Sequence, residues 1–481
     1  MNYIRSIINK QRDKAFFAII LCAACILLYS CKKLVEVPAP VTSINAVNVF
    51  TNDATAASVL TGIYTNLSAS NVVNADPASL FFYTGLSSDE LKLIGTGNKN
   101  FLNYYFNMLN ADESGQSWET IYSMVFVVNS ALEGLSASQA LTPEVKKQLL
   151  GEAAFLRAYC YFYLVNLYGD VPLVLTTDYK VNSNIGRTET KKVYEQIVDD
   201  LKMAIDNLRS EYMAANVIDV SSERVRPNKW TATAMLARVY LFTKNYQGAL
   251  EQSGNVLGQT NTYDLVNVPL NNVFLRDSRE AIWQIPPVNG SNATKEGLAL
   301  LLRENGVDPD KLVLSDYLIN SFEPGDKRKT VWVNSRTAGN DQFFYAYKYR
   351  DGLEYSPKIN EYSVIFRLAE QYLIRAEANT RLNNLTGAAA DLNIVRERAG
   401  LDPVFPTDLS SMLTAIMRER RVELFAEGHR WLDLKRTSTA NEVLGPIKGT
   451  TWTPNAQLYP IPRTDINRNP ALKGMQNPGY K

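Results

Sequence analysis

The run of residues 151–169, GEAAFLRAYCYFYLVNLYG, constrains the fold more than any other stretch because it is apolar on nearly every side. A helix with apolar side chains all round has to be buried among other elements. Gly169, followed by Asp170, Val171 and Pro172, ends the pattern with residues that break helices. The segment therefore predicts a helix enclosed by other helices.

Amphipathic patterns elsewhere predict the surrounding helices, at residues 53–67, 118–135, 191–208 and 413–425. Two further pairs of helices form an internal repeat, at 230–242 with 246–257 and at 366–382 with 386–398. Ala237 and Gly248 are 11 residues apart, as are Ala376 and Gly387. Small residues at such positions allow close helix contact in tetratricopeptide-like hairpins. The two pairs lie too far apart in the sequence to form a tandem array.

Residues 258–360 differ from the rest because they are rich in Pro and Gly, and their short apolar runs at 281–285 and 343–349 suit strands or extended loops. We interpret this stretch as a loop-rich insertion. The fold class that follows is mainly α, a scaffold of tetratricopeptide-like helical hairpins with long irregular loops and a little β. We expect residues 43–481 to form one domain.

The N-terminus has the order of an export signal, with four basic residues, an apolar run at 15–29, and then Ser30 and Cys31. Leu28 to Cys31 resembles the lipobox of bacterial lipoproteins, which implies that Cys31 carries lipid after residues 1–30 are removed. Residues 31–42, which include Pro38 and Pro40, are then a flexible tether. The alternatives are an uncleaved apolar anchor, or an ordinary signal with a chance cysteine.

The cysteine content and the net charge bear on two questions, whether a disulfide can form and whether nucleic acid is a partner. Cys22 and Cys25 leave with the signal and Cys31 is used for lipid, so Cys160 remains alone and no internal disulfide can form. Its apolar context predicts a small buried side chain. Without residues 1–30 the chain keeps 46 basic and 48 acidic side chains. This balance does not indicate a nucleic acid partner.

Five stretches, in order along the chain, together resemble the SusD/RagB family of Bacteroidetes outer-membrane nutrient-binding lipoproteins. They are residues 151–159 continuing to 167–173 (GEAAFLRAY and LYGDVPL), 234–240 (AMLARVY), 366–378 (FRLAEQYLIRAEA), 418–434 (RERRVELFAEGHRWLDL), and 459–462 with 477–480 (YPIP and NPGY). Each stretch is of modest specificity by itself, but the ordered set is highly specific.

The resemblance implies a tetratricopeptide-like scaffold decorated by loops. It also implies a lipid-anchored protein of the cell outer membrane, facing the exterior. Such a protein captures glycan, or sometimes peptide, without enzymatic action and passes it to a SusC-like TonB-dependent β-barrel transporter. No cofactor is implied.

The charged residues of these stretches have a structural interpretation, which we favour over ligand contact. Glu152 and Arg157, Arg375 and Glu377, and the cluster at 418–423 lie on helices that also carry apolar stripes. We expect their charges to pair between helices, because buried charges need partners. We expect Trp431 to be a core aromatic residue and His429 to have a structural role.

Enzymatic chemistry is restricted by the presence of a single histidine, His429, which rules out a multi-histidine metal site. No metal site is predicted. A surface glycoside hydrolase remains the main rival, because it needs only two carboxylates. Its candidate acids are Asp89 with Glu90, Asp112 with Glu113, and those at 351–354. The second rival is a purely structural lid or assembly subunit.

Sugars stack on aromatic rings, and their hydroxyls pair with short polar side chains. Two aromatic clusters beside such residues are therefore candidate glycan sites: Phe101, Tyr104 and Tyr105 with Asn103, and Trp332 with Phe343, Phe344 and Tyr345. Core packing, or the alternating faces of a strand, would explain either cluster equally well. No binding loop of the family matches here by motif.

Overall fold

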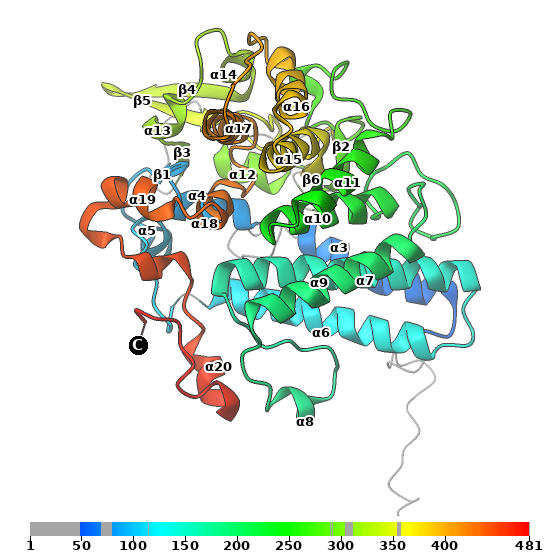
Figure 1. Ribbon diagram of the computed structural model, residues 1–481. Helices are drawn as coiled ribbons and strands as arrows, with labels where there is room; N and C mark the ends of the chain where they lie inside the picture. The colour runs from blue at the N-terminus through cyan, green and yellow to red at the C-terminus, as the bar shows by residue number, and fades with distance from the viewer. Residues whose placement is uncertain are drawn as a thin grey trace, which may run out of the picture. The chain divides into compact units, whose positions relative to one another are not determined.

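The fold is mainly helical, as predicted (Figure 1). The computed structural model describes residues 49–68, 79–113, 115–288, 290, 292–303, 311–353 and 357–480. Cys31, the predicted signal at 1–30 and the predicted tether at 31–42 lie outside the described residues. Among the residues that are described, no helix is both long enough and apolar enough to span a membrane.

The larger helices in chain order are α3 (Asp53–Ser68), α4 (Leu80–Ser87), α5 (Lys99–Tyr105), α6 (Gln116–Ala137), α7 (Pro143–Tyr168), α9 (Thr190–Asn207), α10 (Lys229–Phe242), α11 (Tyr246–Leu257), α15 (Leu368–Arg381), α16 (Leu385–Arg398), α17 (Leu409–Glu423), α18 (Arg430–Arg436) and α19 (Ala440–Lys448). The short ones are α8 (Tyr179–Asn182), α12 (Lys295–Leu300), α13 (Asp316–Ile319), α14 (Lys327–Trp332) and α20 (Arg463–Arg468). The strands are β1 (Leu91–Leu93), β2 (Ala281–Ile285), β3 (Leu312–Leu314), β4 (Val333–Ala338), β5 (Asp341–Ala346) and β6 (Ser363–Arg367).

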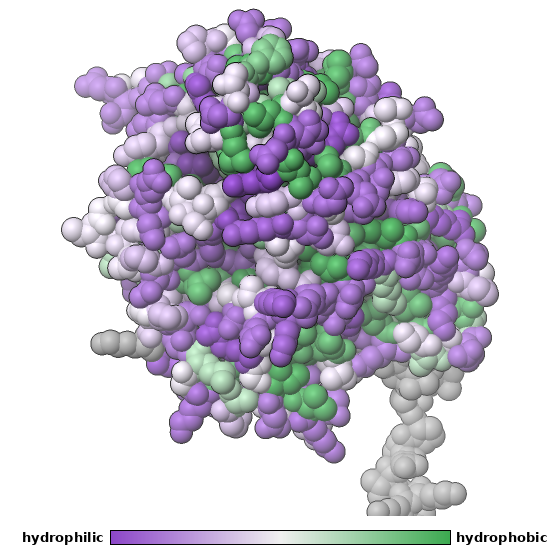
Figure 2. All heavy atoms as spheres, viewed as in Figure 1, coloured by the Kyte–Doolittle hydropathy of each residue, from purple (hydrophilic) through white to green (hydrophobic). Residues whose placement is uncertain are grey.

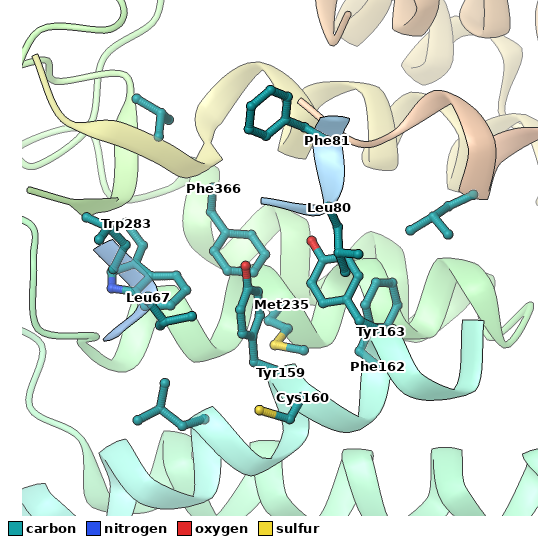
Figure 3. Close-up of a cluster of buried hydrophobic side chains, with 14 of the residues drawn as sticks. Leu67, Leu80, Phe81, Tyr159, Cys160, Phe162, Tyr163, Met235, Trp283 and Phe366 are labelled. Carbon is teal, nitrogen blue, oxygen red and sulfur yellow. The ribbon is translucent and has the colours of Figure 1, made fainter. Parts of the chain in front are cut away.

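Helix α7 is the buried helix that the apolar run predicts, although it begins at Pro143 rather than at Gly151. It contacts α3, α6, α9 and α10. Figure 3 shows part of the resulting core, where side chains of α7 lie among residues of α3, α4, α10, β2 and β6. The side chains labelled there include Tyr159, Cys160, Phe162 and Tyr163 of α7, with Leu67, Met235, Trp283 and Phe366. Cys160 is fully buried, as predicted.

The internal repeat forms two helical hairpins, α10 with α11 and α15 with α16, which lie side by side (Figure 1). Ala237, Leu241 and Ala249 of the first hairpin pack against Ile374 and Ala378 of the second. Repeats that are far apart in the sequence thus become neighbours in one stack.

The turns of the two hairpins are built alike. Lys244 and Asn383 occupy equivalent positions with positive φ, at 62° and 61°. The next residue in each turn is an asparagine whose side chain accepts a hydrogen bond from the backbone N–H of Gly248 or Gly387, at 3.0 and 3.1 Å. These asparagines are N-caps, which satisfy one of the free N–H groups at the start of the second helix.

The strands form three antiparallel pairs, β1 with β3, β2 with β6, and β4 with β5. Strand β2 matches the strand predicted at 281–285 and is buried along its whole length. The predicted helix at 366–382 begins later than expected, at Leu368. Phe366 and Arg367 belong to β6 instead, where they pair with Trp283 and Ala281 of β2. Backbone pairing with a distant strand overrides the local helical pattern at these two residues.

The charged residues of the family-like stretches pair between elements, as predicted. The largest group surrounds Glu423 at the end of α17, which accepts hydrogen bonds from Arg328, Arg367 and Arg398 at 2.5 to 2.8 Å. All four side chains are almost completely buried. Further pairs join Glu152 to Arg226, Arg157 to Asp200, Arg238 to Glu370, Arg375 to Asp391, Glu377 to Arg436, and Arg420 to Asp433.

Trp431 is fully buried, as expected, beside the rings of Trp452 and Tyr459. His429 lies close by, with its Nδ1 3.9 Å from Oε1 of Glu370. Burial lowers the pKa of His429 to about 4, so this imidazole is neutral at pH 7. Its enclosed position supports the structural role predicted from the sequence.

Replacing Gly248 with Ala should destabilise the protein, because the added Cβ would lie 2.6 Å from Cδ2 of Tyr240 and 2.9 Å from Nδ2 of Asn245. Overpacking of this kind costs about 1–3 kcal/mol. Gly254 of the same helix is a matched control, since its added Cβ would meet nothing within 4 Å. There Ala should be neutral or stabilise by up to about 1 kcal/mol. Urea unfolding of both variants measures the difference, and equal effects would contradict the tight turn.

Candidate functional site

The two aromatic clusters predicted from the sequence lie along one continuous run of elements. Helix α5 contacts β1, β1 pairs with β3, and β3 packs on β5 of the β4–β5 hairpin. The short helix α13 follows β3 directly. We call this surface, formed by α5, β1, β3, α13 and the β4–β5 hairpin, the α5–β5 face. These elements follow one another down the left side of Figure 1.

Helix α5 divides its side chains between the core and the surface. It starts at the N-cap Asn98, whose side chain accepts a hydrogen bond from the N–H of Phe101 at 3.1 Å. Phe101 and Tyr104, three residues apart, share the inward side of the helix and are buried. Asn103 and Tyr105 are only partly buried. Helical periodicity thus assigns two aromatic residues of the cluster to packing.

Four of the eight predicted ligand-contacting residues are buried, which corrects the sequence interpretation for them. Phe101 is 8% exposed, and Tyr104, Trp332 and Tyr345 are each 1% exposed. Trp332 donates from Nε1 to the carbonyl of Leu270 at 2.8 Å, so both its ring and its polar atom are used internally. The rings of these residues are out of reach of a ligand at the surface.

The other four predicted residues, Asn103, Tyr105, Phe343 and Phe344, are partly exposed on the α5–β5 face. Alternation along β5 sends Phe343 towards the side of Tyr345 and Phe344 towards the opposite side. The turn of the hairpin has Gly339 with a φ of 62°, which a two-residue turn requires at its first position.

Two exposed aromatic residues complete the face, Tyr317 on α13 and Phe106 after α5, which are 52% and 40% exposed. The sequence interpretation missed Tyr317, because its exposure depends on how the short helix α13 packs beside β1 and α5, which local sequence does not show. Its neighbour Asp316 forms an ion pair with Lys92 of β1 at 3.0 Å. Figure 2 shows that hydrophilic and near-neutral side chains predominate on this side.

Lys448, the last residue of α19, contacts Tyr105 at the α5 end of the face. Its Nζ donates to the carbonyls of Leu86 and Tyr105, at 3.0 and 2.7 Å, and lies 4.4 Å from the centre of the Tyr105 ring. Burial lowers the pKa of Lys448 to about 7. Burial also raises the pKa of Tyr105, and the nearby hydroxyl of Tyr317 and the charge of Asp316 raise it further. Tyr105 therefore offers a neutral phenol held in a defined place.

The chemical groups on this face are suited to reversible binding of a polar, ring-shaped ligand. Aromatic rings present apolar faces, and Asn103, Lys92 and Asp316 supply donors and acceptors at the edges. Asn103 also takes part in a surface cluster, in which Glu113 accepts hydrogen bonds from Asn110 and Lys99 at 2.9 and 3.0 Å. Part of the polar lining is thus already ordered before a ligand arrives.

Asp89 and Glu90, the first pair considered as catalytic carboxylates of a glycoside hydrolase, both lie inside the fold. Asp89 is buried and accepts hydrogen bonds from Arg421 and Arg430 at 2.5 and 2.7 Å. The adjacent Glu90 is also buried, and burial raises its pKa to about 8.

The remaining acids are exposed, partly buried or outside the described residues. Asp112 pairs with Arg463 at 2.5 Å, and Asp351 accepts a hydrogen bond from Asn360 at 2.9 Å. Glu354 is among the residues that are not described. In the described part of the chain, no group of three His, Cys, Asp or Glu side chains is placed to hold a metal ion.

Comparison with known proteins supports the same family from both halves of the chain. A family model described as the SusD family matches residues 276–480. A second, described as starch-binding associating with outer membrane, matches residues 44–241. SusD-like protein P25 of Formosa agariphila is 25% identical and aligns over 94% of this chain and 97% of its own length. Starch-binding protein SusD of Bacteroides thetaiotaomicron is 38% identical, but over only 24% of this chain and 21% of its own.

Solved structures share the fold over most of its length. A SusD superfamily protein from Bacteroides vulgatus superposes with a TM-score of 0.76 at 19% identity, covering 88% of this chain and 98% of that one. A laminarin-binding SusD-like protein superposes with a TM-score of 0.75 at 22% identity, covering 89% and 100%. These structures show the shared fold, and because the ordered motifs, the two family models and the curated relatives agree, the chain belongs to the SusD/RagB family.

Proposed function

We propose that this protein is a surface lipoprotein of the outer membrane that binds a nutrient glycan and delivers it to a SusC-like TonB-dependent transporter. The observation that carries the proposal is the α5–β5 face, where partly exposed aromatic side chains from separate segments meet polar groups. Aromatic residues with few rotatable bonds lose little entropy on binding, and are enriched where proteins bind ligands. Relatives whose names mention starch and laminarin support a glycan as the ligand.

The scaffold behind this face supports binding rather than large rearrangement. Lys448 ties α19 to α4 and α5, and Lys348, two residues after β5, donates to Glu427 at 2.5 Å and to the carbonyl of Glu423 at 2.8 Å. Both ends of the face are thus attached to buried parts of the fold. A preformed site of this kind avoids much of the ordering cost of binding.

Replacing Tyr317 with Ala should weaken glycan binding about tenfold, because it removes an exposed ring from the face at an expected cost of more than about 1 kcal/mol. The measurement is calorimetric titration with a laminarin oligosaccharide and a maltooligosaccharide, followed by a broad glycan array. Phe405→Ala is the matched control, since Phe405 is 72% exposed but lies outside the face. A ligand bound equally by wild type and Tyr317→Ala would contradict this placement. Failure to bind any glycan or peptide, with no barrel co-purifying, would contradict the proposed function.

Replacing Cys31 with Ala should abolish uptake of the glycan in cells and leave binding by the purified protein unchanged. The reason is that, in this proposal, the lipid on Cys31 only determines where the protein is held. Uptake is measured in cells that carry the variant, and binding by titration of the purified chain. Loss of binding in the purified variant would refute this separation of roles.

A surface glycoside hydrolase on the same scaffold is the alternative from the enzyme class. Release of reducing ends from a bound glycan by the purified protein, abolished by one Asp or Glu substitution, would favour it. The described geometry gives it little support, because Asp89 and Glu90 are 3% and 2% exposed. A purely structural lid is the other alternative, and it predicts association with the barrel without a soluble ligand.

Glu90 should limit stability at high pH, which distinguishes a buried structural acid from an exposed catalytic one. Burial, and then the charge of Asp89, raises its pKa to about 8, against about 4.3 in an unfolded chain. Between these values the native state binds one proton more than the unfolded chain, so the free energy of unfolding falls as pH rises from about 4.3 to about 8 and is level above that. Glu90→Gln removes this loss, and its melting temperature relative to wild type should increase by several degrees between pH 5 and pH 9.

Glu113→Gln provides the control for that measurement, because Glu113 is exposed and hydrogen bonds from Asn110 and Lys99 lower its pKa. Its carboxylate stays ionised from pH 5 to pH 9, so the difference from wild type should remain flat. A flat profile for Glu90→Gln as well would contradict the structural assignment of Glu90.

A further inference from the structure

A second candidate binding site lies away from the α5–β5 face, in an open depression of about 880 Å³. Its lining comes from residues 267–279, which precede β2, and from residues 358–360, which precede β6. The volume falls within the range of small-molecule sites, about 300–1,000 Å³. We call it the Arg276 depression. The described residues that line it include no aromatic side chain, so the chemistry of this part of the wall differs from that of the α5–β5 face.

The walls of the depression are held together by backbone hydrogen bonds. The N–H of Arg276 donates to the carbonyl of Asn360 at 3.0 Å, and Leu275 forms an antiparallel bridge with Glu361. The N–H of Ser278 donates to Leu275 at 3.1 Å, which bends the chain between the two arginines. Two segments that are some 80 residues apart in the sequence therefore form one preformed concave surface.

Among the described lining residues, Arg276, Arg279 and Lys358 are basic and Asp277 is acidic. The side chains of Arg276 and Arg279 are 43% and 47% exposed. Nη2 of Arg279 donates to the carbonyls of Thr260 and Asn261, at 2.9 and 3.2 Å, which orients its guanidinium.

Both arginines are loosely paired, unlike the buried arginines of the fold. Arg276 lies 3.4 Å from Glu223 and 3.7 Å from Asp277, and Arg279 lies 3.7 Å from Asp264. The arginines around Glu423 make contacts of 2.5 to 2.8 Å instead. Exposed pairs at the longer distances contribute little, so a ligand anion can replace them.

We propose that the Arg276 depression binds an acidic sugar unit, one that carries a carboxylate or a sulfate ester, of the captured glycan. A guanidinium can donate two parallel hydrogen bonds to two oxygens of either anion. The amides of Asn267, Asn272 and Asn360 line the same depression and suit the hydroxyls of a sugar ring. This inference rests on the proposed glycan binding and narrows the class of ligand to acidic polysaccharides.

The test titrates the purified full-length chain with three probes of equal length: an oligogalacturonate, a sulfated galactan oligosaccharide and a neutral galactan oligosaccharide. At least one acidic probe should bind, more weakly at 200 mM than at 50 mM salt, because exposed charges are screened. Arg276→Gln with Arg279→Gln should weaken that binding at least tenfold. The double variant should keep the melting temperature of the wild type, since both side chains are on the surface.

Two control variants separate this site from others. Arg468→Gln removes an exposed arginine outside the depression and should leave acidic-probe binding unchanged. Tyr317→Ala should weaken binding at the α5–β5 face without removing the contribution of the arginines. Arg276→Lys keeps the charge but loses the paired hydrogen bonds, so it should bind with intermediate affinity.

Several outcomes would overturn the inference. One is an acidic probe that binds the double glutamine variant as tightly as wild type, and another is inorganic sulfate that binds as tightly as the sulfated oligosaccharide. Binding of a neutral glycan that depends on Tyr317, with no binding of either acidic probe, would refute the depression as a site while leaving the proposed function intact. Failure of every glycan to bind would instead refute the proposed function itself.

Discussion

The buried carboxylate of Glu423 is the charge on which the arrangement of the described domain depends most. Removing such a group from water costs several kcal/mol unless it is fully paired. Burial alone would raise the pKa of Glu423, but the guanidinium groups of Arg398, Arg367 and Arg328 hold it well below its usual range. Those three arginines come from α16, β6 and α14. Four elements must therefore meet in one geometry for this charge to be accommodated.

This network connects the helical scaffold to the strands and loops. Arg367 also binds Glu280 and Glu427, at 2.8 and 2.7 Å, and Lys348 binds Glu427 beside it. Because Lys348 follows β5 closely, the hairpin that carries Phe343 and Phe344 is attached to the network. The residues by which the family is most easily recognised thus support the proposed binding face from inside, which explains why they need not contact ligand themselves.

Helical periodicity was sufficient to locate most helices, because an amphipathic pattern reports directly which side is buried. Helix α11 occupies the predicted residues, and α10 differs from its prediction by one residue. The pattern gave the wrong helix bounds where contacts between residues far apart in the sequence determine the local conformation. Phe366 and Arg367 stand in a sequence with a helical pattern, but they pair with β2. Helix α7 begins eight residues before the apolar run, because only one side of its first turns is buried. The packing of the two hairpins against each other could not be predicted either, because the sequence of each hairpin does not indicate which other helices it contacts.

For the candidate site, the sequence by itself identified which residue types could hold a sugar, and it located two stretches where they gather. It also determined the family, through motifs whose charges have to be paired wherever they are buried. Only the tertiary structure decided which aromatic residues are available. Tyr104 and Trp332 are in the core, Tyr105 and Phe343 reach the surface, and Tyr317 joins them from a segment more than 200 residues away from α5. The physical reason is that exposure of a side chain depends on what the rest of the chain packs against it, and local sequence does not contain that information.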